Sequence, residues 1–365
     1  MVWEEGLKCP PTRFFAMAET ESNGSYTYPN TSGDPDRRDV LRNKLGIQSH
    51  KELRVEEYRA AAFRMAEIAE GDGPKGTFDA QHLKAIHGHI FQDIYEWAGH
   101  TRDESPVVDG QRVEPIGNLS KGGTSFLHGS RIEMGLDEAF RPIRNPEILR
   151  GSSGEQFAEI AGKVLAELNY VHPFREGNGR AQEALLASIG REYGHEVDFT
   201  VITKPRMIDA SIATTNERSS PAMKHIFEDA IDPNRQEAIR AAFVDLEMRG
   251  ENAFEHNVRT ARPGEQISGQ VLGHDIRVAS LVTDHGIVAV DRADLPERLP
   301  DDDSEITFTA RSDFSRLSRP DQVRNADNPT VERMSPEQKI AADPSRLAEL
   351  SAQKQPERDS DDRER

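Results

Sequence analysis

Nine consecutive residues near the middle of the chain combine side chains that suit phosphate chemistry. They run from His172 to Arg180 and read HPFREGNGR. His172 titrates near neutrality and can take a proton from an attacking hydroxyl. Glu176 is a hard oxygen ligand, of the kind that holds Mg²⁺ together with nucleotide phosphates. Arg180 adds a planar, permanently charged fork for phosphate oxygens.

The backbone of this stretch suits the same chemistry. Gly177 and Gly179 permit a turn and let the main chain come close to an oxyanion, and Asn178 adds a neutral donor. Taken one at a time, these residues also fit a plain structural interpretation, in which His172 caps a helix and the glycines only make a turn. Their combination within nine residues favours a phosphate site.

Apolar residues recur at helical spacing on both sides of the stretch. Upstream they extend from Phe157 to Leu168, and downstream they continue from Ala181 until the stop signals Gly190 and Gly194. The stretch is therefore predicted to be a loop at the N-terminus of a helix. The first amide groups of a helix have no partner within it, so they form an anion site.

The nine residues match, at every specified position, the signature H-P-F-x-[D/E]-G-N-G-R of the Fic (filamentation induced by cAMP) family. A second segment, FDAQHLKAIHGHIFQDIYEWAGHTR at 78–102, resembles the helix of this family that ends in Trp-Ala-Gly. The resemblance covers about residues 25 to 232. Most Fic proteins are protein adenylyltransferases, which move AMP from ATP to a hydroxyl of a target protein and release pyrophosphate.

The resemblance implies a role for each position. His172 would deprotonate the target's Ser, Thr or Tyr hydroxyl, which then attacks the α-phosphorus. Glu176 would hold Mg²⁺ between the α- and β-phosphates. The rest of the nucleotide site would be formed by Gly177, Asn178, Gly179 and Arg180, the last of which would stabilise the leaving pyrophosphate.

Residues 104–126 break the helical pattern and are rich in Gly, Pro and Ser. Val107 and Val108 favour a strand, and Asp109-Gly110 is a turn signal. In Fic proteins this position holds the flap, a hairpin that docks a segment of the target by strand addition. The resemblance makes 121–126 its return strand and assigns Lys121 and Gly122 to the nucleotide site. The alternative is a mobile surface loop.

One position departs from the family pattern. AMP-transferring members commonly carry a second arginine three residues after the first, where it holds the γ-phosphate, and this chain has Glu183 there. Three alternatives stay open: Arg175 or Arg191 compensates, another donor is used, or activity is weak. The runner-up functions are therefore transfer of phosphate, UMP or phosphocholine, and a catalytically weak partner-binding module.

The resemblance also implies partners. Family members of the toxin or type IV secretion effector kind act on topoisomerase subunits or small GTPases, and the sequence does not choose between these targets. Fic enzymes are usually held inactive by a helix bearing [S/T]-x-x-x-E-[G/N]. This motif does not occur in the sequence. Either a separate small antitoxin supplies the inhibitory helix, or the protein is unregulated.

Composition narrows the function classes. The net charge of −18 and a pI near 5.2 argue against binding to nucleic acid or to an anionic membrane surface. Cys9 is the only cysteine, which fits a reducing compartment. The sequence shows no signal peptide and no apolar run near the length of about 20 residues that spans a membrane. We expect the bacterial cytoplasm, or translocation into a recipient cell.

The expected architecture is mainly α, with four parts. A flexible arm at 1–30 precedes a Fic domain with trailing helices at 31–250. β-favouring runs then predict a small β-barrel of OB type at 255–313, an order common in effector-like Fic proteins. Few apolar residues remain in 314–365, which we expect to be a disordered tail or linker.

Three finer predictions concern the N-terminal half. A short helix is expected over 39–45, and Thr77 is expected to cap the helix that follows it. His82, His87 and His89 lie on that helix, but their spacing does not place them on one face. We therefore expect packing or surface histidines and no zinc site.

Overall fold

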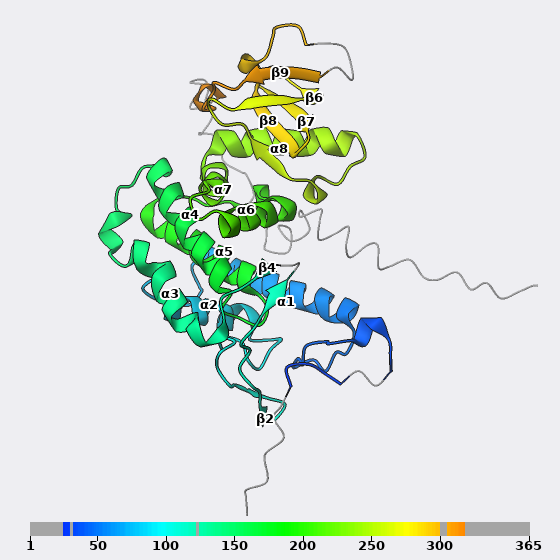
Figure 1. Cartoon of the computed structure of the whole chain (residues 1–365), viewed down its shortest axis with the longest axis vertical. Helices are drawn as coiled ribbons and strands as arrows, with labels where there is room; N and C mark the ends of the chain where they lie inside the picture. Colours follow the sequence, from blue (N-terminus) through cyan, green and yellow to red (C-terminus); the bar gives the residue numbers. More distant parts are fainter. Residues whose placement is uncertain (1–24, 30–31, 122–123, 300–304, 318–365) are drawn as a thin grey trace, which may run out of the picture.

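The computed structural model describes residues 25–29, 32–121, 124–299 and 305–317. Within these ranges a helical part is followed by a C-terminal β-sheet (Figure 1). Most of the predicted arm at 1–30 and of the predicted tail at 314–365 lies outside the described residues. The predicted mainly α architecture is confirmed. No helix in the described ranges has the length and hydrophobicity of a transmembrane span.

The helical part is built around one buried helix, α4, which packs against α3, α5, α6 and α7. Ser153 and Gln156 form a capping box at its start, so two main-chain donors are satisfied there. The helices are α1 (His50–Glu70), α2 (Ala80–Phe91), α3 (Ile132–Phe140), α4 (Gly154–Val171), α5 (Asn178–Tyr193), α6 (Lys204–Asn216), α7 (Ala222–Ile231) and α8 (Pro233–Met248).

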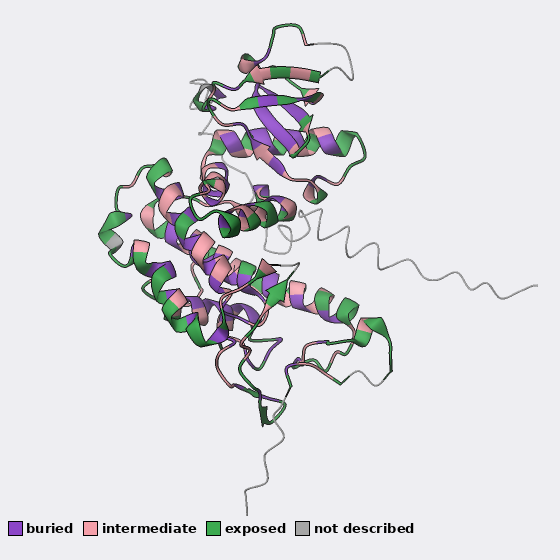
Figure 2. Cartoon of the chain, viewed as in Figure 1, coloured by how far each residue is buried: buried purple, intermediate pink, exposed green. Residues whose placement is uncertain are grey.

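The helices that flank the nine-residue stretch follow their predicted faces. Phe157, Val164 and Leu168 of α4 are fully buried, as is Leu185 of α5. Figure 2 shows the buried residues on the inward sides of these helices. α5 continues through Gly190 and ends at Gly194, whose φ of +86° is the left-handed conformation typical of a helix C-terminus.

Two N-terminal predictions are wrong. Residues 39–45 form no helix, because this segment pairs with residues near Tyr26: the N–H of Tyr28 donates to the carbonyl of Val40, and that of Arg42 to Tyr26, each over 2.8 Å. The N-cap of α2 is Asp79, which accepts from the N–H of His82 over 2.9 Å.

The predicted flap consists of two short hairpins and not one. β1 (Val107–Val108) pairs with β2 (Gln111–Arg112) across the predicted Asp109-Gly110 turn. β3 (Ser120–Lys121) pairs with β4 (Thr124–Ser125). The predicted return strand at 121–126 is therefore wrong, since Lys121 pairs with Thr124 and Ser125 with Ser120, and Val107 and Val108 pair with β2 instead. Gly122 lies outside the described residues.

The C-terminal sheet has the strand order β5-β8-β7-β6-β9. Only β5 and β8 run parallel. α8 packs against β5, β6, β7 and β8. The sheet is open among the described residues, with β5 and β9 at its edges, so the predicted barrel is not confirmed. The strands are β5 (Val258–Thr260), β6 (Gln266–His274), β7 (Val278–Thr283), β8 (Gly286–Asp291) and β9 (Glu305–Thr309).

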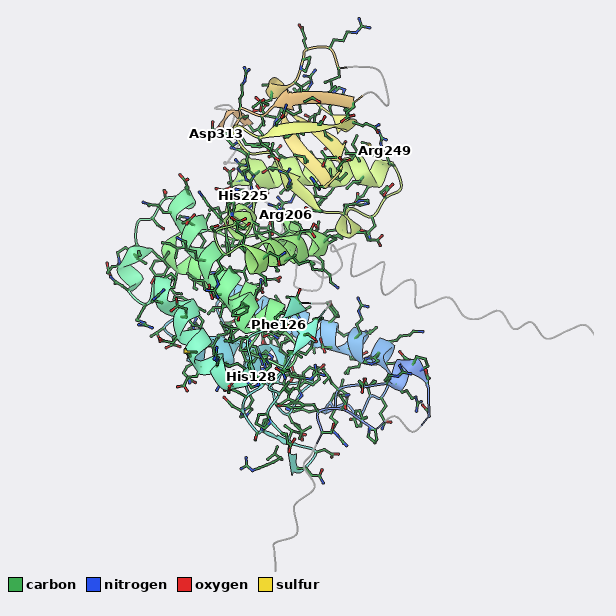
Figure 3. The ribbon with its side chains drawn as sticks, in the orientation of Figure 1. Phe126, His128, Arg206, His225, Arg249 and Asp313 are labelled. Atoms are coloured by element: carbon green, nitrogen blue, oxygen red, sulfur yellow. The ribbon has the colours of Figure 1, made fainter. Side chains whose placement is uncertain are left out.

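A buried charge cluster joins the helical part to the sheet. The carboxylate of Asp229, on α7, is fully buried and pairs with Arg206 of α6 over 2.5 Å and with Arg262 over 3.0 Å. It also accepts from the hydroxyl of Thr260 on β5. Figure 3 shows Arg206 at this junction. Burial would raise the pKa of Asp229, but the neighbouring guanidinium groups together lower it, so its charge is retained.

Candidate active site

Two residues in left-handed backbone conformation bound the loop between α4 and α5. His172, with φ of +46°, ends α4 and donates its N–H to the carbonyl of Leu168 over 2.9 Å. Gly177, with φ of +83°, begins α5. A Cβ at Gly177 would lie 2.3 Å from the ring of Phe91, so glycine is required there. The predicted loop at a helix N-terminus is confirmed.

The side chain of Asn178 holds the loop together. Its carboxamide oxygen accepts from the N–H of Phe174, and its amide nitrogen donates to the carbonyl of Phe174, each over 2.9 Å. Asn178 is almost fully buried. One of the two hydrogens of its amide nitrogen is thus used within the loop, and the expected role of this side chain as a neutral donor to an oxyanion stays a prediction. Its backbone N–H in the first turn of α5 is a further donor for that role.

His87 supports the loop from beneath. Its ring stacks on Phe174, with ring centroids 3.8 Å apart. Nδ1 accepts from the N–H of Gly99 over 2.9 Å, so Nε2 carries the hydrogen that is donated to the carbonyl of Glu176 over 3.0 Å. Burial lowers the pKa of His87 to about 3, which keeps the ring neutral. The predicted packing role is confirmed, but its contact with the loop carbonyl could not be seen in the sequence.

His172 is poised as a proton acceptor. Burial lowers the pKa of its imidazole to about 4, and the carboxylate of Glu176 opposes the shift. The ring is therefore neutral at pH 7, as a general base requires. Its ring stacks on that of Phe126, with centroids 3.8 Å apart and planes 10° apart. Figure 3 shows Phe126 in the helical part, near β4.

The carboxylate of Glu176 lies four residues along the same loop. One of its oxygens accepts from the N–H of Gly177 over 3.1 Å, and the other lies 3.8 Å from the ammonium of Lys121. Burial acts to raise the pKa of Glu176, but Lys121 and the Gly177 N–H outweigh it and lower the pKa. The group is thus an anion with one oxygen facing β3. Lys121, which is mostly exposed, does reach the loop.

Arg180 projects from the first turn of α5 into an aromatic and acidic environment. One terminal nitrogen, Nη2, donates to the carboxylate of Glu57 over 2.5 Å. The guanidinium lies over the rings of Phe91 and Tyr58, at 4.6 Å and 5.1 Å from their centroids. Nη1 is buried and makes no hydrogen bond to any described residue. One terminal nitrogen of the predicted fork is thus bound to an acid on α1, and the other is enclosed without a hydrogen-bond partner among the described residues.

The carboxylate of Glu57 is a site residue that the sequence did not indicate. It also accepts from the hydroxyl of Tyr95, and both side chains are buried. Burial acts to lower the pKa of Arg180, but Glu57 reverses the shift and raises it. A separation of 123 residues lies between the two partners. No local spacing pattern could have revealed that pair.

The structure thus brings His172, Glu176, Arg180 and Lys121 together around one helix N-terminus. Arg191, one of the two candidates to replace the missing second arginine, lies at the far end of α5. The 11 residues from Arg180 correspond to about 16 Å along the helix. Its guanidinium donates to the carbonyl of Ile68 over 3.1 Å. Arg191 is therefore poorly placed to reach a nucleotide at this loop.

Comparison with known sequences identifies the group of proteins to which this site belongs. Residues 77–189 match a family model described as the Fic/DOC family. The probable protein adenylyltransferase y4lH of Sinorhizobium fredii is 35% identical over 188 residues, which are 51% of this chain and 89% of that protein. The protein adenylyltransferase of Bartonella henselae is 29% identical over 250 residues, 68% of this chain and 44% of the relative. VbhT of Bartonella schoenbuchensis is 34% identical over 52% of this chain and 36% of its own length.

Solved structures that are similar to this chain indicate the same group of proteins. The type IV secretion system effector protein BepA superposes with a TM-score of 0.69 at 28% identity, over 79% of this chain and 96% of BepA. The BepC protein of Bartonella tribocorum, with bound AMPPNP, gives a TM-score of 0.52 at 33% identity, over 57% of this chain and 96% of that one. The chain spans less than half the length of the two Bartonella adenylyltransferases named above. The helical fold, the complete nine-residue signature and the extended similarity to y4lH together establish that this chain belongs to the Fic/DOC family.

Proposed function

We propose that this chain is a protein adenylyltransferase that transfers AMP from ATP to a hydroxyl side chain of a target protein and releases pyrophosphate. One observation carries the proposal: a neutral imidazole, an ionised carboxylate and a helix N-terminus meet in a single loop, at His172, Glu176 and Gly177. The names of the curated relatives and the AMPPNP bound to BepC support the same activity and donor.

The chemistry assigned to the site is an in-line substitution at phosphorus. His172 takes the proton from the target hydroxyl, whose oxygen forms a bond to the α-phosphorus while the bond to the pyrophosphate oxygen breaks. Backbone amides at Asn178 and Gly179 face the negative charge that develops on the phosphate. The guanidinium of Arg180 stabilises the departing pyrophosphate.

The donor set fits a magnesium ion that is bound through the nucleotide. Mg²⁺ in such sites is held by one or two carboxylates, with phosphates and water supplying the other ligands. Glu176 is one such carboxylate, and the described residues contain no group of three or more potential metal ligands. Glu176 would hold the ion, which supplies charge neutralisation on the phosphates. The ammonium of Lys121 would then be free to contact the nucleotide.

The low pKa of His172 gives a testable pH dependence. A base with a pKa of about 4 is already deprotonated at neutral pH. The rate of AMP transfer at saturating ATP is therefore expected to be flat from about pH 6 to 8 and to fall only as the pH approaches 4. Initial rates measured across this range test the assignment. A tenfold rise in rate centred near pH 6.5 would contradict it.

A second candidate function rests on Glu183. Its carboxylate lies one turn after Arg180, where other members hold the γ-phosphate with an arginine, and it would repel a triphosphate bound in that pose. This favours a diphosphate donor, as in phosphocholine transfer, whereas UMP or phosphate transfer would need a triphosphate bound in another pose. If Glu183 faces the nucleotide, Glu183→Arg should tighten ATP binding by about tenfold, because a repulsion becomes an attraction.

Calorimetric titration with ATP measures this change. The matched control is Glu192→Arg, which makes the same charge change at an exposed site near the far end of α5. Equal or weaker ATP binding by Glu183→Arg would show that this position does not face the γ-phosphate.

We also propose the partners and the compartment. The acceptor is a protein with an accessible Ser, Thr or Tyr, with topoisomerase subunits and small GTPases as the first targets to test, and a small antitoxin as a candidate inhibitor. The effector relatives favour translocation into a recipient cell as well as a cytoplasmic location. The division into a Fic domain at 31–250 and an OB-like domain at 255–313 is likewise a proposal.

The direct test is incubation of the purified chain with ATP labelled on the α-phosphate, Mg²⁺ and bacterial lysate. We expect one or more labelled proteins. Absence of labelled protein from bacterial and host lysates alike would contradict the proposed activity.

A further inference from the structure

Arg102 is a fully buried arginine whose hydrogen bonds all go to main-chain carbonyls within the described residues. Burial acts to lower the pKa of its guanidinium. A buried guanidinium is costly to the fold unless its N–H groups have hydrogen-bond acceptors. Its side-chain nitrogens donate to the carbonyls of His172 (2.9 Å), Ile116 (2.8 Å), Gly117 (3.0 Å), Val171 (3.3 Å) and Leu127.

These carbonyls belong to three segments. Val171 and His172 form the junction of α4 with the loop between α4 and α5, Ile116 and Gly117 precede the second hairpin, and Leu127 follows it after Phe126. A main-chain hydrogen bond of 3.0 Å from Leu127 to Tyr170 joins the first and the last of these segments. Arg102 therefore fixes the hairpin end relative to the backbone of His172.

The consequence is the position of Phe126, the residue before Leu127. Its N–H donates to the carbonyl of Leu119 over 3.0 Å, so its backbone is held from the other side as well. Its ring then lies parallel to that of His172 at 3.8 Å between centroids. Nδ1 of His172 is buried, and its polar neighbour is the main chain of Asn169, which acts to raise the pKa of the ring without a hydrogen bond of ordinary geometry. Ring stacking on Phe126 acts together with this contact to set the plane of the imidazole.

We propose that Phe126 is a positioning residue for His172, held in place by Arg102. The proposal rests on the proposed function, in which His172 is the base. Phe126 covers one face of the imidazole, so the ring cannot rotate away from the approaching hydroxyl. Its aromatic face also favours the imidazolium that forms when His172 takes the proton. The bonds made and broken in the transfer are unchanged.

The kinetic test compares Phe126→Leu, which keeps apolar bulk but removes the stack, with Phe126→Tyr, which keeps the ring. With α-labelled ATP and lysate acceptor, Phe126→Leu should lower the saturating rate by about tenfold and leave the KM for ATP unchanged. Phe126→Tyr should retain the wild-type rate. The matched control is Phe63→Leu, at a half-exposed position on α1, which should change neither value.

If Phe126 only stabilised the fold, the two Phe126 variants would show a different pattern of rates. In that case both Phe126 variants would lose rate in proportion to a lowered melting temperature. A wild-type rate in Phe126→Leu, or an equal loss in Phe126→Tyr, would overturn the positioning role.

An activity-independent measurement separates this proposal from the proposed function. Proton NMR of the histidine rings, assigned with His172→Gln, should show the His172 signals shifted upfield by the Phe126 ring. The shift should vanish in Phe126→Leu and persist in Phe126→Tyr. Unshifted signals in the wild-type protein overturn the stack, and the proposal with it, even if AMP transfer is observed. Shifted signals in a protein that transfers no AMP would instead contradict the proposed function.

Discussion

The variant His172→Ala is expected to lose AMP transfer by about 10²–10⁴-fold while it keeps its fold, because the reaction loses its general base. His172 ends α4 and its ring contacts that of Phe126. Its buried Nδ1 has the main chain of Asn169 as a polar neighbour but makes no hydrogen bond of ordinary geometry to a described residue. Its removal should therefore cost little stability. The left-handed backbone at this position is somewhat less favourable for alanine than for histidine, so the substitution adds a small cost in stability.

Two measurements separate the loss of the base from a loss of structure. Initial rates with α-labelled ATP should fall to near background, and the thermal unfolding midpoint should stay within a few degrees of the wild-type value. His195→Ala is the matched control, because this partly buried histidine contacts Ser152 and Phe157 far from the loop. Transfer by His172→Ala at the wild-type rate would show that another group is the base.

The variant Arg102→Leu is expected to lower the free energy of unfolding by at least about 3 kcal/mol. Its guanidinium satisfies five carbonyls in the interior, and leucine would leave them without a donor. Each hydrogen bond to a charged group contributes about 1.5–3 kcal/mol, of which relaxation and water entry recover a part. The expected loss is therefore large but well below the sum of the five bonds.

Urea unfolding of both proteins measures the difference. The matched control is Arg112→Leu, since the exposed Arg112 on β2 donates to a single carbonyl, that of Ser105, over 3.1 Å. That change should stay within about 0.5 kcal/mol. Equal stabilities of Arg102→Leu and Arg112→Leu would contradict the anchoring role of Arg102.

The two helices and the turn of the site were predictable, because they depend on residues that are close together in the sequence. The spacing of Phe157 to Leu168 and the glycines after the loop are enough to predict two helices joined by a tight turn. The left-handed backbone at Gly177 follows from the same reasoning. The side-chain partners of the site residues could not be predicted from local spacing, because partners such as Glu57 of Arg180 lie far away in sequence.

The wrong prediction for residues 39–45 has a physical cause, which is competition from a distant segment. Residues 39–45 have a weak helical pattern, but pairing with the segment at Tyr26 satisfies their backbone instead. The two hydrogen bonds between the carboxamide of Asn178 and the main chain of Phe174 were not predicted, because the sequence indicated only a donor to a ligand.

The measurement that tests the central claim most directly is a comparison of ATP labelled on the α-phosphate with ATP labelled on the γ-phosphate. Each is incubated with the purified chain, Mg²⁺ and lysate, beside His172→Ala. The proposed function predicts labelled protein from the α label only, and none with the variant. Transfer of the γ label would contradict AMP transfer and show a kinase-like reaction at this site.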